Sequence, residues 1–180
     1  MISNGEKLPA VFVDRDGTLI HDADYCSDPK RVRIFEGVPE ALRKLRQCGY
    51  KIVVVTNQSG IGRGFFTVDQ YRAVEAEVSR QIGKNLIDAT YFCPDVPGEP
   101  SKCRKPAPGM VLQAAEDHKI DLGRSFLIGD KEIDAECAHH AGVRAIRVRT
   151  GFDKMTDGSS ADWIAEDFAN AVAIIVDQTE

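Results

Sequence analysis

The sequence predicts an α/β fold in which helices cover both faces of a doubly wound parallel sheet. Short apolar runs, rich in valine and isoleucine, alternate along the chain with longer segments whose apolar residues recur at helical spacing. The runs are apolar almost throughout, which is typical of strands buried on both faces of a parallel sheet. Several of them stop abruptly at a polar or acidic residue. In such a sheet the carboxyl ends of the strands form the edge at which ligands bind.

The first predicted strand, residues 9–13, ends at Asp14, and a second acid, Asp16, stands two positions further on. Alone, this pattern is more typical of a turn that closes a strand, because aspartate side chains hydrogen-bond readily to nearby backbone amides. A polar stretch without periodicity, residues 20–29, follows it and predicts a loop over the strand ends. This loop is long enough to contact a substrate.

A helix is predicted over residues 39–49, because proline suits the first turn of a helix and glycine its end. The second predicted strand, residues 51–57, is apolar up to its last two positions. Residues 58–64 follow directly and contain three glycines and Arg63. Glycine lets backbone amides approach an anion and arginine binds one through two nitrogens, so this segment predicts an anion site, with a flexible surface turn as the alternative.

The rest of the chain continues the alternation of helices and strands. The predicted elements are a helix over 67–84, a strand over 88–93, a helix over 108–118, a strand over 125–130, a helix over 132–141, a strand over 145–148 and a helix over 167–176. In the helix over 108–118, Val111, Leu112 and Ala115 are expected to face the core. Segment 94–108 is irregular and rich in proline, and a loop of this length usually has a functional role or is disordered.

Length and charge exclude several classes of protein. With 180 residues, the chain is most simply one domain, 1–180, in which residues 1–7 form a polar leader without an assigned role. Its net charge of -5 argues against nucleic acid or a membrane surface as a partner. We expect a cytoplasmic monomer, because no run is apolar enough to span a bilayer and no helix has a surplus apolar face. The five cysteines are an odd number, so no disulfide framework is expected.

The predicted topology brings polar residues from several strand ends to one edge of the sheet. These residues are Asp14, Asp16, Thr56, Asn57 and Asp130, and Lys105 lies in the irregular loop that can arch over them. Carboxylates are the ligands that Mg²⁺ prefers, and lysine and hydroxyl groups bind phosphate oxygens. The sequence therefore predicts a magnesium site and a phosphate site that share one crevice.

These groups suit phosphoryl transfer. Asp14 would attack phosphorus, while Mg²⁺ on Asp14, Asp130 and a backbone carbonyl would offset the repulsion between the carboxylate and a phosphate dianion. Thr56 and Lys105 would stabilise the equatorial oxygens as charge redistributes. Asp16, when protonated, would give its proton to the leaving alcohol and later take one from the attacking water.

Four segments, in chain order, resemble the four motifs of the haloacid dehalogenase (HAD) superfamily of phosphatases. They are Asp14-Arg15-Asp16-Gly17-Thr18, Val55-Thr56-Asn57-Gln58-Ser59-Gly60, Cys103-Arg104-Lys105-Pro106 and Gly129-Asp130-Lys131-Glu132-Ile133-Asp134. Together and in this order the motifs are highly specific, and the match extends over residues 9–151. Nothing within it resembles an inserted cap domain, so the resemblance implies a capless, HAD-like Rossmannoid fold.

The resemblance also implies a role for each matching residue. Asp14 is implied as the nucleophile and Asp16 as the general acid/base, with Mg²⁺ on Asp14, the Asp16 carbonyl and Asp130. Thr56 and Lys105 would hold the transferring phosphoryl group. The implied substrate contacts lie in the segment 22–25, with Asp22 and Tyr25 at its ends, and at Asn57, Gln58, Ser59, Arg104 and Lys131. We add Arg63 for its charge and its glycine neighbours. Asp134 would support Lys131 or the metal ligands.

The implied substrate is a small phosphorylated sugar, and histidinol phosphate is the alternative within the superfamily. A protein that keeps the fold and binds a ligand without turnover is the alternative outside enzymes. Such proteins usually lack the nucleophile or a metal ligand, whereas here every catalytic position is filled. Without a cap, the choice of substrate depends on the loops over the strand ends.

The segment before Arg104 departs from the family pattern. Relatives often carry a structural Zn²⁺ there, on Cys-x-His followed by Cys-x-Cys. In this chain Cys93 and Cys103 match, whereas Asp95 and Ser101 replace the other two ligands. Two thiolates and an acid make a poor tetrahedral zinc set, so we expect no structural Zn²⁺ and expect both cysteines to be ordinary packing residues.

Overall fold

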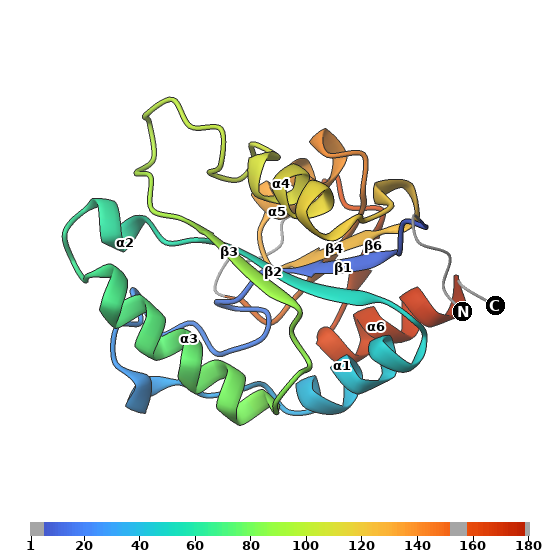
Figure 1. Ribbon diagram of the computed structural model, residues 1–180, viewed down its shortest axis with the longest axis horizontal. Coiled ribbons are helices and arrows are strands. Elements are labelled where there is room, and N and C mark those ends of the chain that lie inside the picture. Colours follow the sequence, from blue (N-terminus) through green and yellow to red (C-terminus); the bar gives the residue numbers. More distant parts are fainter. Residues whose placement is uncertain (1–5, 152–157, 179–180) are drawn as a thin grey trace.

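Strand β1 lies in the interior of a six-stranded parallel sheet (Figure 1). The computed structural model describes residues 6–151 and 158–178, so most of the predicted leader, residues 1–7, lies outside the described ranges. The strand order is β3-β2-β1-β4-β5-β6. The chain thus builds the sheet outward from β1 in one direction and then from β4 in the other. This is the doubly wound arrangement that the sequence predicts, and the prediction is confirmed.

The strands are β1 (Ala10–Val13), β2 (Lys51–Asn57), β3 (Ala89–Cys93), β4 (Phe126–Gly129), β5 (Arg144–Val148) and β6 (Trp163–Ala165). All four residues of β1 are fully buried, as expected for a central strand covered on both faces. Their side chains alternate between the two faces of the sheet, so Val11 and Val13 enter one core and Ala10 and Phe12 the other.

The helices are α1 (Val38–Gln47), α2 (Ser59–Gly62), α3 (Val68–Ile82), α4 (Gly109–His118), α5 (Glu132–His140) and α6 (Phe168–Asp177), with 3-10 turns at Pro29–Arg31 and Leu122–Arg124. Helices α1, α3 and α6 contribute to one core, and α4 and α5 pack on the opposite face (Figure 1). None of the helices within the described ranges combines the length and the apolar character needed to cross a membrane.

Local sequence explains where α3 begins. Thr67 Oγ1 accepts a hydrogen bond from the Gln70 amide at 3.2 Å, and Gln70 Oε1 accepts one from the Thr67 amide at 2.8 Å. This reciprocal cap satisfies two backbone donors that the first turn of a helix leaves free. The helix therefore starts at a fixed point beyond the short helix α2, and this fixes the position of Glu75 and Tyr71 on α3.

Two details of the predicted fold are wrong. Leu112 is 45% exposed, and the residues of α4 that face the core are Met110, Val111 and Ala114. Leu112 lies on the opposite side of the helical wheel from these positions and therefore points toward solvent. Strand β6 was not expected, because three residues are too short to give an apolar run; it forms the sheet edge by parallel pairing with β5.

Candidate active site

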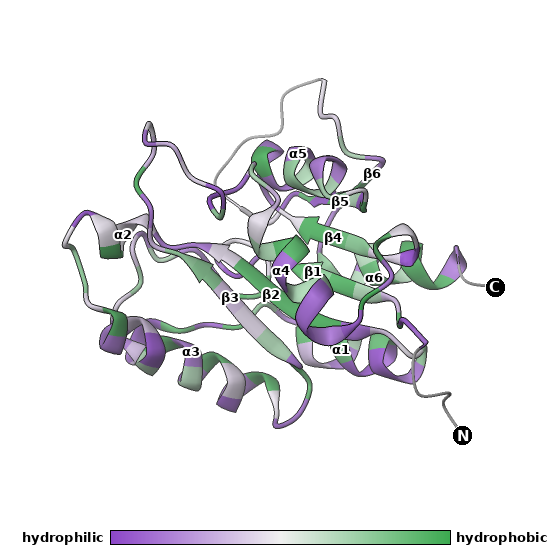
Figure 2. Ribbon diagram, turned by 45° about the horizontal axis from the view of Figure 1, so that its top comes forward, coloured by the Kyte–Doolittle hydropathy of each residue, from purple (hydrophilic) through white to green (hydrophobic). Residues whose placement is uncertain are grey.

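The carboxyl ends of β1, β2 and β4 meet at one edge of the sheet, where these hydrophobic strands give way to hydrophilic loops (Figure 2). Val13 lies beside Val54 on one side and Ile128 on the other, so the residues that follow these strands are neighbours. Asp14 and Asp130 follow β1 and β4, and Thr56 lies near the end of β2. All three are buried. The predicted convergence at this edge is therefore present in the structure.

Lys105 reaches this edge from the irregular loop and is buried between two carboxylates. Its Nζ atom lies 2.8 Å from Asp14 Oδ1 and 2.6 Å from Asp134 Oδ1, and it donates to the Val55 carbonyl at 2.9 Å. Burial favours the neutral amine, but the negative charges of Asp134 and Asp14 outweigh it and raise the pKa of Lys105 above its ordinary value. The site therefore contains a fixed ammonium group against Asp14.

The Asp130 carboxyl group lacks hydrogen-bond partners inside the described part of the site. Neither of its oxygens has a hydrogen-bond partner among the described residues, although both are buried. Burial and the charges of Asp14 and Asp134 raise its pKa to about 8. Gly17 and Gly151 lie against this carboxylate, and a side chain at either position would collide with it. An orphaned carboxylate in such surroundings is expected where a cation belongs.

The neighbouring acids fit the same conclusion. Oxygen atoms of Asp14, Asp130 and Asp134 lie within 4.8 Å of one another. Both oxygens of Asp134 already have partners, Lys105 Nζ at 2.6 Å and the Lys131 amide at 3.1 Å. Asp134 thus supports the two lysine residues, and Asp14 and Asp130 remain as the carboxylates available to a metal. The donor set fits Mg²⁺, which takes oxygen ligands.

Asp16 lies beside this cluster, and its carboxylate is held by two neighbours. Arg15 Nε donates to Oδ2 at 3.1 Å and Arg15 Nη2 donates to Oδ1 at 3.2 Å. Gln58 Nε2 donates to Asp16 Oδ2 at 2.8 Å and to Thr56 Oγ1 at 2.9 Å. The Asp16 side chain is nevertheless 20% exposed. It is therefore both oriented and accessible.

Two cavities open at this edge and share part of their lining. The smaller one, about 40 Å³, is lined by Asp14, Asp16, Thr56, Asn57, Lys105, Lys131, Ile133 and Asp134. The larger one, about 280 Å³, is lined by all eight of the predicted substrate contacts, Asp22, Tyr25, Asn57, Gln58, Ser59, Arg63, Arg104 and Lys131. Asp16 lines both. The smaller cavity is next to the carboxylates and the larger one extends away from them.

The larger cavity is cationic on one side. Arg63 and Arg104 both line this cavity. Burial and the nearby charge of Arg63 lower the pKa of Arg104. Arg104 Nη1 also donates to the Asp95 carbonyl at 3.1 Å, which holds its side chain against the irregular loop. Burial alone would lower the pKa of Lys131, but the negative charges of Asp130 and Asp14 outweigh this effect and raise the pKa above its ordinary value. These cations are suited to an anionic ligand.

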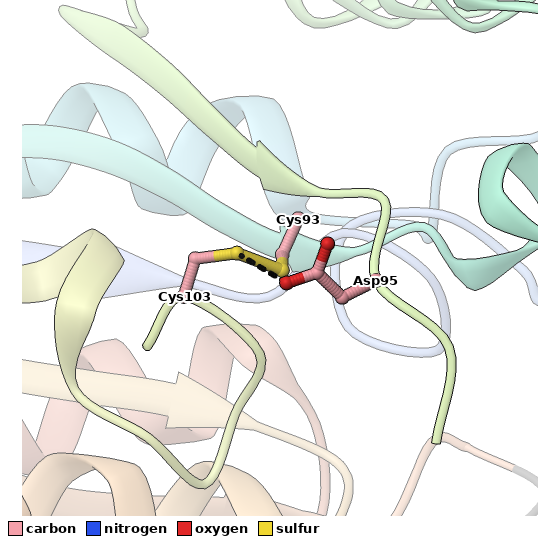
Figure 3. Close-up of side chains that lie close together, drawn as sticks. All are labelled: Cys93, Asp95 and Cys103. Atoms are coloured by element: carbon pink, nitrogen blue, oxygen red, sulfur yellow. Dashed lines mark hydrogen bonds between the residues drawn. A yellow bond between two sulfur atoms is a disulfide. The ribbon is translucent and has the colours of Figure 1, made fainter. Parts of the chain in front are cut away.

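The irregular loop is tied to the end of β3 by a disulfide between Cys93 and Cys103 (Figure 3). The expectation that both cysteines are ordinary packing residues is therefore wrong. The loop returns to its starting point, so the two Cα atoms lie 5.6 Å apart, within the range that a disulfide spans. Ser101 Oγ donates to Asp95 Oδ2 at 2.6 Å and accepts from the Arg104 amide at 2.9 Å. Residues 93, 95, 101 and 103, the four positions of the family's zinc pattern, thus lie close together. The absence of a structural Zn²⁺ stays a prediction.

Several residues near the site were not identified from the sequence as substrate contacts. Cys26, Pro97 and Ile133 also line the larger cavity, as does Asp24, which lies within the predicted contact segment 22–25. Cys26 directly follows this segment in the loop after β1, and its proximity to the predicted contacts was the available signal. Arg15 gave no such signal, because an arginine between two aspartates is indistinguishable from a surface residue until the fold shows it fully buried.

Comparison with known proteins identifies the family. The HAD-hydrolase-like family model matches residues 102–171. The chain is 36% identical over 176 residues to D-glycero-beta-D-manno-heptose-1,7-bisphosphate 7-phosphatase from Yersinia pestis, with 92% of this chain and 94% of the relative covered. The chain belongs to the heptose 1,7-bisphosphate 7-phosphatase family of the HAD superfamily. The enzyme of the same name from Escherichia coli is 35% identical over 176 residues, with 92% of each chain covered.

A solved structure supports the same assignment to the heptose bisphosphate phosphatases. The chain is similar to the D,D-heptose 1,7-bisphosphate phosphatase of B. bronchiseptica in complex with magnesium and phosphate. The TM-score is 0.82 and the identity 28%, with 95% of this chain and 99% of the other covered. The resemblance seen in the four motifs is thus confirmed, and the class of enzyme that goes with the family is phosphoric monoester hydrolase.

Proposed function

We propose that this chain is a Mg²⁺-dependent phosphatase that removes the C7 phosphate of D-glycero-D-manno-heptose 1,7-bisphosphate through an aspartyl-phosphate intermediate. The observation that carries the proposal is the orphaned, buried carboxylate of Asp130 beside Asp14 and Lys105. It combines a cation site, a nucleophile and a fixed positive charge at one small cavity. The names of the Yersinia pestis and Escherichia coli relatives support the substrate, and the B. bronchiseptica complex supports the cofactor.

In the first step an oxygen of Asp14 bonds to phosphorus, and the electron pair of the broken P–O bond stays on the leaving oxygen. Lys105 Nζ, 2.8 Å from Asp14 Oδ1, orients this carboxylate and presents its charge to the phosphoryl oxygens. Thr56 Oγ1 accepts from Gln58 Nε2, so its own hydrogen is free for a phosphoryl oxygen. Asp14, Asp130 and the Asp16 carbonyl would hold Mg²⁺, which would offset the negative charges of the Asp14 carboxylate and the phosphate.

Asp16 moves the protons in both steps. It gives its proton to the leaving oxygen as the C7–O–P bond breaks, so that a neutral alcohol departs. Its carboxylate then takes a proton from the water that attacks the phosphorus of the aspartyl-phosphate. The second step releases inorganic phosphate and restores the Asp14 carboxylate. The partial exposure of Asp16 and its place in the lining of both cavities support this role.

The larger cavity supports a substrate that carries a second phosphate. Arg63, Arg104 and Lys131 line it beyond the carboxylate cluster and would bind the C1 phosphate. Asp22 and Tyr25, on the loop after β1, would contact the sugar hydroxyls and ring. The pattern of glycines and arginine over residues 60–64, and the Phe66-Thr67 pair after it, resemble the heptose enzymes more than histidinol-phosphatases.

Phosphate release tests the proposal directly. We expect rapid release from heptose 1,7-bisphosphate with Mg²⁺, none with EDTA, and slower release from histidinol phosphate. Asp14→Asn is expected to abolish turnover without loss of the fold, because the amide lacks the nucleophilic carboxylate. Asp69→Asn, on the exposed side of α3, is the matched control. Comparable, slow release from every ester would refute the assigned substrate, and undiminished activity in Asp14→Asn would refute the mechanism.

We also propose that one chain is the functional unit, a single HAD-like domain over residues 1–180. The nucleophile, the acid/base, the cation site and the proposed substrate contacts are all supplied by one chain, so the proposed reaction requires no residue from a second copy. Gel filtration of the active enzyme is expected to give the mass of one chain. Activity confined to a dimer fraction would contradict this.

A further inference from the structure

We propose that Arg15 is a positioning residue for phosphoryl transfer: its guanidinium fixes the orientation of Asp16, and Glu75 and Tyr71 fix the guanidinium. The proposal rests on the proposed function, since it takes Asp16 as the general acid/base. Arg15 does not line either cavity at the strand ends, so it acts through Asp16 and not on the substrate.

The burial of Arg15 is the first observation that requires an explanation. Its side chain has no exposed surface, although it is charged and follows the strand end directly. Removing a guanidinium from water is costly unless its donors are paired. The turn after β1 does not need this side chain, because the Arg15 carbonyl accepts the amide hydrogen bonds from Thr18, Leu19 and Ile20 that close it. An apolar residue would fill the same space without a charge.

The contact with Asp16 explains why a guanidinium is present. Two nitrogens of Arg15, Nε and Nη2, donate to the two oxygens of Asp16 at 3.1 and 3.2 Å. This paired geometry fixes the plane of the carboxylate as well as its distance, which one ammonium group cannot do. Gln58 Nε2 adds a third donor at 2.8 Å and links Asp16 to Thr56. The general acid/base is thus coupled to the residues of the phosphoryl site.

The guanidinium is itself held from the other side by α3 and β3. Arg15 Nη1 lies 3.5 Å from Glu75 Oε2, and Glu75 Oε1 accepts from Thr90 Oγ1 at 3.2 Å. The Arg15 Cζ atom lies 5.3 Å from the centre of the Tyr71 ring, which packs at 4.4 Å on Phe92. Helix α3 and the β3 edge lie next to each other on this side of the sheet (Figure 1). Helix α3 and strand β3 therefore act together, through Arg15, on the orientation of one carboxylate.

A positioning role has a specific kinetic consequence. A sugar alkoxide is a poor leaving group and depends on the proton from Asp16, whereas p-nitrophenolate leaves as a stable anion without one. Both esters share the later step in which Asp16 takes a proton from water, but kcat/KM reports only the steps up to departure of the leaving group. Misplacing Asp16 should therefore lower kcat/KM for a sugar phosphate much more than kcat/KM for p-nitrophenyl phosphate. A loss of folding or of the phosphoryl site would slow both esters alike.

The test measures kcat, KM and kcat/KM for the sugar phosphate and for p-nitrophenyl phosphate, in wild type, Arg15→Lys and Glu75→Gln. Arg15→Lys keeps the charge but loses the paired hydrogen bonds to Asp16, and we expect kcat/KM for the sugar phosphate to fall about 30- to 100-fold. For p-nitrophenyl phosphate we expect a loss below about threefold. Glu75→Gln should show the same selectivity with a smaller loss, about threefold to tenfold. Glu77→Gln is the matched control, because Glu77 pairs with Arg80 on the same helix at similar exposure.

Each outcome decides the question. A loss in kcat/KM that is selective for the sugar phosphate supports the proposal, and equal losses in kcat/KM on both esters overturn it. If thermal unfolding shows that Arg15→Lys does not fold, Glu75→Gln decides alone: no loss, or the same loss on both esters, overturns the proposal. A wild-type protein that hydrolyses neither ester would refute the proposed function itself, and this proposal with it, before any variant is compared.

Discussion

Replacing Asp130 by asparagine is expected to stabilise the metal-free protein while it abolishes activity. The Asp130 carboxyl is buried without a partner among the described residues, and its pKa rises from 3.8 to about 8 through burial and the charges of Asp14 and Asp134. At neutral pH an unfolded chain ionises this group and the folded chain does not, which favours unfolding. At about 1.4 kcal/mol per unit of pKa, this penalty reaches up to about 4 kcal/mol at about pH 7. Asparagine has nearly the same shape as aspartate but does not ionise, so the variant does not carry this penalty.

The sign of the pH dependence follows from the raised pKa. The contribution of protonated Asp130 to stability is fully present below the ordinary pKa of 3.8 and is lost as the pH rises toward about 8. In EDTA, the difference in free energy of unfolding that favours Asp130→Asn over wild type should therefore vanish near about pH 4 and grow toward neutral pH. Mg²⁺ should reverse the order, because only the wild-type protein gains stability from binding the ion.

Urea unfolding followed by circular dichroism measures these differences. The free energy of unfolding is compared for wild type and Asp130→Asn, with EDTA and with Mg²⁺, at acidic and at neutral pH. Asp69→Asn controls for the loss of a charge, since Asp69 is exposed on α3. The reasoning would be refuted by a variant that is less stable than wild type in EDTA at neutral pH, or by equal stabilisation of both proteins by Mg²⁺.

Three further predictions concern the charges around the site. Lys105→Met should cost about 3–5 kcal/mol in urea unfolding and remove activity, because it leaves buried carboxylates unpaired. Adding Asp134→Asn to the Lys105→Met protein should restore most of the stability but no turnover. Recovered turnover would contradict a catalytic role for Lys105. Mg²⁺ affinity, measured by calorimetry, should rise about tenfold per pH unit up to about pH 8, because the ion displaces a proton from Asp130; a flat profile would contradict this. Arg63→Ala should raise KM about tenfold for the bisphosphate but little for a monophosphate, unlike exposed Arg72→Ala.

The central strands and the charged residues that meet at their carboxyl ends could be predicted from the sequence. Strands β1 and β2 are continuous apolar runs that end in polar residues, and parallel topology places those ends together. Asp14, Asp130 and Lys105 could therefore be assigned to one crevice before their distances were known. Strand β6 could not be found this way, because three residues carry no periodicity and depend on pairing with β5.

Contacts between distant segments account for what the sequence did not reveal. The disulfide depends on the path of the loop between Cys93 and Cys103, and cysteine counting gave no indication of that path. The burial of Arg15 depends on α3 packing over it, which brings Glu75 within reach across 60 positions of sequence. The inward face of α4 was misjudged at Leu112, because consecutive apolar residues in a short helix allow more than one choice of face.

The most direct test of the proposed function is ³¹P NMR of heptose 1,7-bisphosphate during turnover. With Mg²⁺ present, the C7 phosphate resonance should disappear as inorganic phosphate grows, while the C1 phosphate resonance remains. The same sample in EDTA should not change. Loss of the C1 phosphate, or no release at all with Mg²⁺, would contradict the proposed reaction.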